Sequence, residues 1–213
     1  GANFVSNIEC NTASPTLTSC VIRNNYTHGM DLNGNSFPTV SNCAFTGNGG
    51  FAIEGVSLAA VAGLTNNTAS GNGGDYARVT TGAVNADLAI SSSMMINNVV
   101  VIDSAVTVGA GATLTLNAGV IFKYRSAQYV TVNGSLVANG TSGSPVIFTD
   151  FSDDSAGGNT NGGGVSNGGA TSWYGIVFNA TSSACTLDHA DIRYGGANFV
   201  SNIECNTASP TLT

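Results

Sequence analysis

The feature that most constrains the fold is a short apolar pattern that recurs along the chain at intervals of 22 to 26 residues. The segments "TLDHADIRYGG", "TLTSCVIRNN", "TVSNCAFTGNGG" and "GLTNNTASGNGG" can be aligned on the apolar Leu or Val at the second position of each. A recurrence of this length is the signature of a solenoid, in which each repeat stacks on its neighbours. The aligned residues are Leu187, Leu17 (equivalent to Leu212), Val40 and Leu64.

Apolar and polar residues alternate in the second half of the chain. "VTV" at Val106 is matched by "VTV" at Val130, and "LTL" at Leu114 by "SLVA" near Leu136. A period of two within runs of three to five residues predicts strands rather than helices. The predicted inward-facing residues are Val106, Val108, Leu114, Leu116, Val120, Phe122, Val130, Val132, Val146 and Phe148. The predicted outward-facing residues are Thr107, Thr113, Thr115, Lys123 and Thr131.

These patterns predict an all-β chain, a right-handed parallel β-helix with about eight coils of 22 to 26 residues. The bends between strands are expected at Ser19, Asn42 and Asn66, because such residues tolerate left-handed backbone angles and cap their own turns. Residues 149–172 are rich in Gly, Asn and Ser and are predicted to form a loop that projects from the coils. Residues 75–98 are the least regular part and are interpreted as an awkward coil or a junction between β-helical blocks.

The chain ends with the text with which it begins. Residues 196–213 repeat residues 1–18, "GANFVSNIECNTASPTLT", without a change. The sequence is therefore interpreted as a single β-helical domain over residues 1–213, made of one 195-residue period and the first 18 residues of the next. The repeated segment is predicted to be most of one coil.

Charge and composition exclude several classes of partner. Only 8% of the residues are charged, against about 25% in an average globular protein. The net charge of −7 and the five basic residues argue against a nucleic-acid partner, which would need a basic face. The stretch "MMINNVVVI" is too short and too interrupted by Asn to span a membrane, and no membrane insertion is expected.

Several stretches resemble a known family. "VIDSAVTVGAGATLTLNAGVIFKY", "WYGIVFN" and "LDHADIRYGG" resemble the right-handed parallel β-helix of the pectate-lyase-like superfamily, and more narrowly a repeat of large secreted and cell-surface bacterial proteins. The close resemblance covers about residues 101–195. It implies an extracellular or cell-surface location.

No catalytic constellation is predicted. β-Helical enzymes that cleave acidic polysaccharides gather carboxylates, calcium and a basic residue on adjacent coils of one face. Asp188 and Asp191 have no acidic neighbours in the coil alignment, and His28 and His189 are interpreted as solvated turn residues. The chain is therefore expected not to be an enzyme.

Two small groups of residues each predict a weak ligand site. Arg23 and Arg193, with Asp191, are predicted at one outward position on successive coils across the repeat boundary, where they either bind an anionic glycan or form a solvated ion-paired face. Asp153 and Asp154, with Asn159, supply oxygen ligands for calcium, or else keep a loop tip soluble. Acidic residues that the family often carries in this loop are replaced by Asn159 and Gly163. No cofactor other than calcium is expected.

Cys20 and Cys43 are predicted at the same inward position one coil apart. Neighbouring coils lie within the Cα separation that a disulfide tolerates, about 4.4 to 6.8 Å. Two buried free thiols stacked as small hydrophobic groups satisfy the same pattern. Both alternatives stay open.

Two functions from different classes fit the sequence. In the first, the chain is a structural repeat of an extracellular or cell-surface stalk, adhesin or fibre, whose partners are copies of itself joined end to end, covalently or by assembly. In the second, it is a carbohydrate-active enzyme, a polysaccharide lyase or hydrolase, or a module that binds surface glycans. The 195-residue period favours the first.

Overall fold

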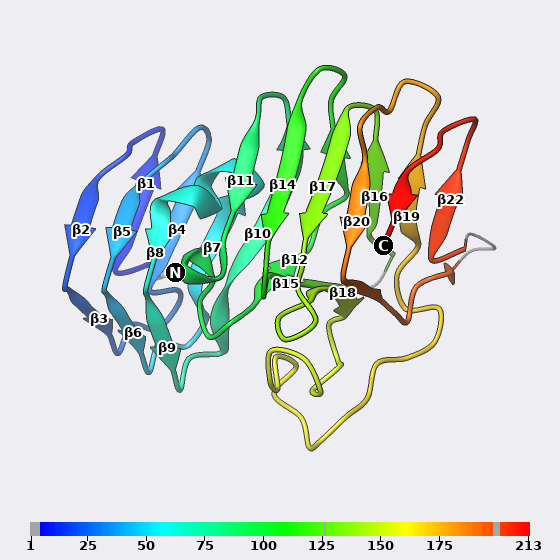
Figure 1. The fold of residues 1–213 in the computed structure, drawn as a ribbon. Helices are drawn as coiled ribbons and strands as arrows, with labels where there is room; N and C mark the ends of the chain where they lie inside the picture. Colours follow the sequence, from blue (N-terminus) through cyan, green and yellow to red (C-terminus); the bar gives the residue numbers. More distant parts are fainter. Residues whose placement is uncertain (1–4, 126, 198–200) are drawn as a thin grey trace.

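The protein is a right-handed parallel β-helix of about eight coils, as predicted (Figure 1). A computed structural model describes residues 5–125, 127–197 and 201–213. Two short 3-10 turns lie wholly within these residues, and no α-helix is assigned among them. Every pairing between the named strands is parallel, so each coil hydrogen-bonds to the coil before it and the coil after it.

The first three coils each contain three short strands. Their strands are β1 (Ile8–Asn11), β2 (Thr16–Thr18) and β3 (Val21–Arg23); β4 (Met30–Asn33), β5 (Thr39–Ser41) and β6 (Ala44–Thr46); and β7 (Phe51–Ser57), β8 (Leu64–Thr65) and β9 (Thr68–Ser70), with the 3-10 turn η1 (Leu58–Gly63) between β7 and β8.

The remaining coils run from an 11-residue strand to the repeated segment at the end of the chain. Their elements are β10 (Gly74–Val84), β11 (Leu88–Ile90), the 3-10 turn η2 (Ser92–Met94) and β12 (Val100–Ile102); β13 (Val106–Val108), β14 (Thr113–Asn117) and β15 (Ile121–Tyr124); β16 (Tyr129–Val132), β17 (Ser135–Asn139) and β18 (Val146–Asp150); β19 (Gly175–Phe178), β20 (Thr186–Asp188) and β21 (Ala190–Ile192); and β22 (Ile203–Cys205) and β23 (Thr211–Leu212).

The strand register confirms the coil alignment. Leu17 pairs with Val40, and Val40 pairs with Leu64. Leu187 pairs with Leu212 of the repeated segment. A slip of one residue would turn every inward side chain outward, so a register that keeps these residues in one row is strongly specified.

The bends between strands also lie where the sequence predicts them. Ser19, Asn42 and Asn66 have φ angles of 55°, 54° and 53°, in the left-handed region. Each of these residues donates its backbone N–H to a carbonyl of the next coil, as Ser19 does to Ser41 O at 3.0 Å. The corner positions therefore combine a left-handed turn with continued hydrogen bonding between coils.

The predicted inward-facing residues form the core. All ten have a relative exposure of 1% or less. Phe122 and Phe148 stack edge to face on successive coils, with ring centroids 6.2 Å apart. The outward Thr residues are half-buried, as the alternation requires.

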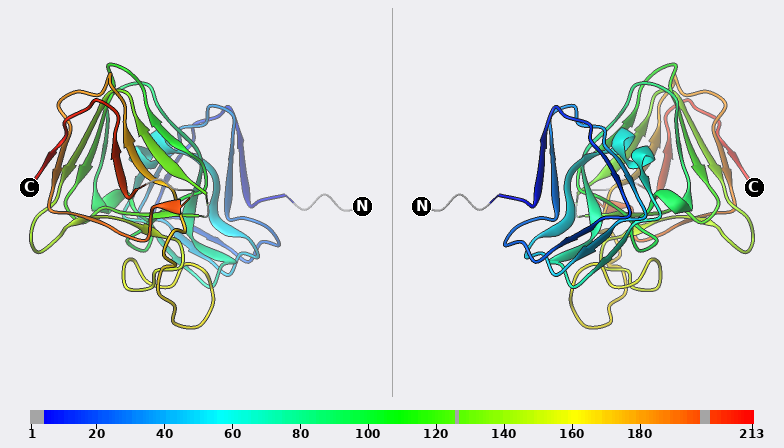
Figure 2. Two further views of the ribbon diagram at one scale, coloured as in Figure 1. Left: turned by 90° about the vertical axis from the view of Figure 1, so that its right-hand side faces the viewer. Right: turned by 90° about the vertical axis from the view of Figure 1, so that its left-hand side faces the viewer.

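Strand β10 lies where the coils change shape. Its first part pairs with β7 and β12, and its last part, from Gly82, pairs with β13. We call the sheet β1, β4, β7, β10, β12, β15, β18 and β21 the long sheet, because it runs through the whole stack. The β2-β5-β8 and β3-β6-β9 sheets end near this strand, and the sheets that contain β13 and β11 begin there. The two halves of the stack are consequently offset sideways (Figure 2).

The Gly-rich segment of residues 149–172 starts inside β18 and then leaves the coils, as the yellow loop in Figure 1 shows. Part of it returns over the outer face of the long sheet. Lys123, on β15, donates from Nζ to Gly158 O at 2.5 Å and to Thr160 Oγ1 at 3.0 Å. The side chain of Lys123 points outward, as predicted, but the loop covers it and leaves it 0% exposed.

Candidate functional site

Three carboxylates form a row on the outer face of the long sheet. Glu9 of β1 pairs with Asp31 of β4, and Asp31 pairs with Glu54 of β7. Adjacent strands of a sheet lie about 4.8 Å apart, so these residues occupy neighbouring outward positions on three successive coils. The row exists because each of these strands places its apolar residues inward and an acidic residue at the alternate position.

Basic residues continue the row along the same face. Arg78 of β10 binds Glu54, with Nη1 2.7 Å from Oε1, and on its other side binds Asp103, with Nε 2.7 Å from Oδ2. Arg125 Nε lies 3.4 Å from the same Asp103 oxygen. Charges therefore alternate from Glu54 onward, while Glu9 and Asp31 have no basic partner among the ion pairs of the described residues.

The environment favours the protonated form of the inner carboxylates. Burial raises the pKa of Asp31, and the nearby Glu9 charge raises it further, against an opposing effect of His28. Burial also raises the pKa of Glu54, although Arg78 opposes this. Glu54 Oε2 is buried without a hydrogen-bond partner in the described part of the chain. Carboxyl groups in such surroundings are typical of functional sites, and also of structural ion pairs.

Aromatic rings flank the carboxylates. His28 stacks on Phe51 with centroids 5.3 Å apart and planes at 7°. His28 Nδ1 accepts a hydrogen bond from Phe51 N at 2.9 Å, which places the proton of the neutral ring on Nε2. Further ring contacts extend from Phe51 to Tyr76 and from Tyr76 to Phe151 of the loop. His28 lies between β3 and β4, in agreement with its interpretation as a turn residue, but its ring is half-buried, stacked on Phe51 and hydrogen-bonded rather than freely solvated.

We call the surface formed by His28, Asp31, Glu54 and Arg78 the outer groove. Its volume is about 750 Å³, and loop residues around Gly34 and backbone near Thr80 complete its walls. Carboxylates, an imidazole and a guanidinium facing one groove can hydrogen-bond sugar hydroxyls and exchange protons with them. The sequence did contain a signal for this site: Glu9, Asp31, Glu54 and Arg78 are spaced by 22, 23 and 24 residues, the same coil spacing that the apolar residues follow.

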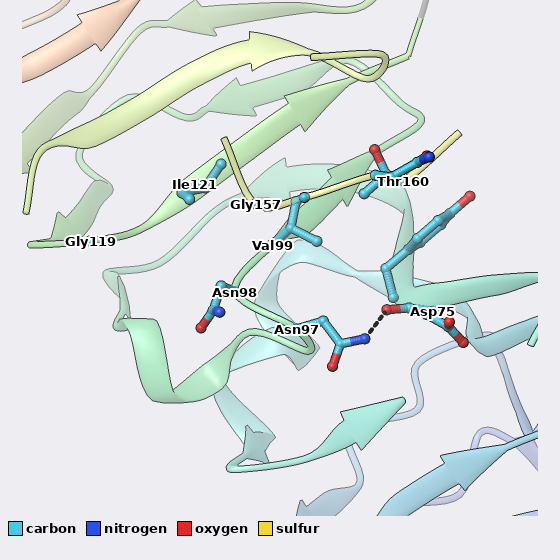
Figure 3. A pocket seen from close by; sticks show the side chains of 11 residues that line it. Asp75, Asn97, Asn98, Val99, Gly119, Ile121, Gly157 and Thr160 are labelled. Atoms are coloured by element: carbon cyan, nitrogen blue, oxygen red, sulfur yellow. Dashed lines mark hydrogen bonds between the residues drawn. The ribbon is translucent and has the colours of Figure 1, made fainter. Parts of the chain in front are cut away.

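A second hollow lies beside the projecting loop (Figure 3). Asn97 donates from Nδ2 to Asp75 O at 3.1 Å, and Gly157 and Thr160 of the loop form the opposite wall. The hollow has a volume of about 680 Å³. Asp75 is its one ionisable carboxylate, so we do not assign a reaction to it.

The structure separates the residues of the predicted glycan site. Arg193 contacts Asp153 at 2.9 Å and Asp191 at 3.6 Å. Arg23 ends β3 in a different sheet, in the first coil, whereas Arg193 follows β21 near the other end of the stack. Within one chain these two arginines do not form a common surface, since the alignment that joins them runs across the boundary between two repeats.

The loop residues predicted to bind calcium are engaged by other groups. Asp153 accepts from Thr149 and Ser155 and pairs with Arg193. Asp154 Oδ2 accepts from Ser166 N at 2.7 Å, while its Oδ1 is buried without a partner in the described residues. Asn159 Oδ1 accepts from Gly162 N, and the described residues contain no cluster of His, Cys, Asp and Glu suited to a metal ion. This arrangement does not fit calcium, which prefers several free oxygen ligands.

Cys20 and Cys43 lie on adjacent coils, as the alignment requires, and both are free thiols. Cys20 N donates to Cys43 Sγ at 3.3 Å. Each thiol donates to the carbonyl two residues before it, that of Thr18 or Ser41. Cys43 is buried, whereas Cys20, which lies in the first coil, is exposed.

Comparison with protein families decides the relationship of this chain. The family model described as a pectate-lyase-like β-helix domain matches residues 82–203, more than half of the chain. The chain belongs to this family. The match begins within β10, where the coils change shape, and ends within β22. No curated protein and no solved structure matched the chain.

Membership in the pectate-lyase-like β-helix domain family supports a structural or carbohydrate-related role. It does not choose between them. In the residues that the structure describes, no helix has the length and apolar character needed to cross a membrane.

Proposed function

We propose that this chain is a structural repeat of an extracellular or cell-surface stalk, adhesin or fibre, built by end-to-end stacking of β-helical repeats. One observation carries the proposal. The segment that opens the stack as β1 and β2 also closes it as β22 and β23, in identical sequence.

The two copies use opposite edges of the same strand. Ile8 pairs with Met30 of the following coil, whereas its copy Ile203 pairs with Ile176 of the preceding coil. Likewise, Glu9 pairs with Asp31 of the following coil, whereas its copy Glu204 pairs with Val177 of the preceding coil. A segment with one partner on each side is an interior coil of a longer stack, so the end of one repeat and the start of the next share one coil.

The length and shape of the native material test this proposal. We expect the native polypeptide to have an intact mass several times the 21.3 kDa of this chain, and negative-stain images to show elongated, periodic particles. A native mass near 21.3 kDa, together with globular single particles at all concentrations, would contradict the fibre.

The outer groove favours a second function, the binding or cleavage of a glycan. The row of Glu9, Asp31 and Glu54 beside His28 gives this face ionisable groups on successive coils. Glu54 is held by Arg78, which also suits a purely structural ion pair, so we place this function second.

Replacement of one groove carboxylate distinguishes a glycan-binding groove from a purely structural group of ion pairs. If the groove binds a neutral or acidic polysaccharide, Asp31→Asn should weaken retention on that polysaccharide about tenfold or more, because hydrogen bonds to charged groups contribute about 1.5–3 kcal/mol. Glu204→Gln is the control, since Glu204 is also a carboxylate on a strand but does not line the groove. Equal retention of all three proteins, or no retention on any polysaccharide, would remove the glycan function.

A further inference from the structure

We propose that Asn167, in the projecting loop, is a site of spontaneous deamidation, a modification that converts its side-chain amide into a carboxylate without an enzyme. The product is aspartate or isoaspartate, and it adds one negative charge to the loop. The inference is independent of the proposed repeat function, because it concerns the chemistry of a single loop residue.

Seven asparagines of this chain stand directly before a glycine, the sequence in which deamidation is easiest. The backbone nitrogen of the following residue has to approach the side-chain carbonyl carbon of the asparagine, and a residue without a Cβ permits that approach. Sequence alone does not choose among the seven, which are Asn33, Asn48, Asn72, Asn133, Asn139, Asn161 and Asn167.

The reaction consumes the backbone N–H of the glycine. At Asn167, the nitrogen of Gly168 would form a bond to Cγ, the bond from Cγ to Nδ2 would break, and the proton of the attacking N–H would leave with the amide group as ammonia. Water then opens the cyclic imide at either of its carbonyls, which gives aspartate or isoaspartate. A glycine N–H that already donates to a carbonyl must first lose that hydrogen bond, so it reacts more slowly.

The coils hold the glycine N–H in four of the seven pairs. Each of these N–H groups donates to a carbonyl of a neighbouring coil, at 2.8 to 3.2 Å: Gly49 to Asn25 O, Gly73 to Asn48 O, Gly134 to Val108 O and Gly140 to Asp188 O. Asn48 is also only 1% exposed, and its Nδ2 donates to Ile22 O. Stacking of the coils therefore protects these asparagines.

Two further pairs are held in other ways. Gly162 N donates to Asn159 Oδ1 at 3.0 Å, and Asn161 Nδ2 donates to Ser166 Oγ at the same distance. Asn33 ends β4, and its carbonyl accepts from Thr12 N at 3.1 Å and from Ser36 Oγ at 2.7 Å. The peptide group that joins Asn33 to Gly34 is thus fixed at its carbonyl.

The pair of Asn167 and Gly168 has none of these restraints. Within the described part of the chain, neither the Asn167 side chain, nor its carbonyl, nor the Gly168 N–H makes a hydrogen bond, and Asn167 is exposed to water. The residues on either side are anchored instead, Ser166 N to Asp154 Oδ2 at 2.7 Å and Gly169 N to Asp150 Oδ2 at 3.0 Å. The peptide group between these anchors is free to turn into the reactive geometry, and isoaspartate would lengthen the backbone between them by one methylene.

Peptide mapping of the full chain tests the proposal. The folded protein is incubated at mildly alkaline pH, samples are digested with pepsin in acid, and the deamidated fraction at each asparagine is measured by mass spectrometry. We expect Asn167 to convert first and Asn48 and Asn72 to stay unmodified while it does so. In urea the seven sites should convert at similar rates, because every glycine N–H is then free. An Asn167 that converts no faster than the other sites of the folded chain would overturn the proposal.

Asn139 is the matched internal control, since its side chain is exposed like that of Asn167 but the N–H of Gly140 is bound to Asp188 O. Equal conversion of Asn139 and Asn167 would mean that exposure, and not a free N–H, sets the rate, and would overturn the inference. Asn167→Gln should remove the early acidic shift in isoelectric focusing, because a glutamine side chain must close a larger and slower-forming ring. An early acidic shift that persists in this variant would also overturn it.

Discussion

An Asp153→Ala variant is expected to have a free energy of unfolding about 3–6 kcal/mol lower than that of the original chain, because it loses two hydrogen bonds to a buried carboxylate, which contribute about 1.5–3 kcal/mol each. Asp153 is 0% exposed and accepts hydrogen bonds from Thr149 Oγ1 and Ser155 Oγ, each at 2.6 Å. Its loss leaves Arg193 without its closest carboxylate and Thr149 without an acceptor. Urea unfolding followed by circular dichroism, at a protein concentration low enough to keep the chain monomeric, measures the change.

Asp191→Ala is the matched control for this variant. Asp191 contacts the same Arg193, at 3.6 Å, but its side chain is 44% exposed. Exposed ion pairs contribute about 0–1 kcal/mol, so this variant should unfold close to the original chain. Equal destabilisation by the two variants would show that burial of Asp153 is not the source of its effect.

The pH dependence of the Asp153 effect follows from its pKa. Burial alone would raise this pKa, but hydrogen bonds from Ser155 and Thr149 and the charge of Arg193 outweigh burial and hold the pKa below its ordinary value. A lowered pKa in the folded state means that the stabilisation is present above the unfolded pKa of about 3.9 and is lost as the pH falls toward the folded value. The difference between the original chain and Asp153→Ala should therefore shrink below about pH 4.

Trp173→Ala should destabilise the fold by about 3–5 kcal/mol, the usual cost of removing a large buried aromatic side chain. Trp173 is 0% exposed and stacks on Tyr124 with ring centroids 4.3 Å apart. Its Nε1 donates to Arg193 O at 2.9 Å, so the indole also fixes the chain that leads from β21 into the repeated segment. Thermal and urea unfolding should both report the loss.

Tyr174→Ala serves as the control for Trp173→Ala. Tyr174 follows Trp173 directly but stacks on the partly exposed Tyr129 and is itself half-buried. Its replacement should cost about 1 kcal/mol. A Trp173 variant no less stable than this one would mean that the space left by the indole is refilled by its neighbours.

The sequence predicts the coils well because their physics is local and periodic. The register of Val40 and Leu64 and the left-handed angles at Asn42 and Asn66 follow from apolar spacing and turn chemistry. These properties need only a strand of period two and a corner every few residues.

The features that the sequence analysis missed depend on the path of the chain in space. Burial of Lys123 requires that the loop fold back over β15, and the path of the loop cannot be predicted from its Gly-rich sequence. The stacking of His28 on Phe51 depends on how two coils meet. The acidic row of Glu9, Asp31 and Glu54 was accessible in principle, since it needs only that the coil spacing be applied to charged residues as well as to apolar ones.

The change of coil shape at β10 has a mechanical consequence for any assembly of these chains. Of the sheets that enter this strand from the first three coils, the long sheet alone continues beyond it. A stack of repeats would therefore not be a straight rod, because its axis would be displaced sideways once in every eight coils. At about 4.8 Å per coil, eight coils correspond to about 40 Å of axial advance. Bending and torsion would concentrate at these displacements, and the fibre would flex once per repeat while the coils between stayed stiff.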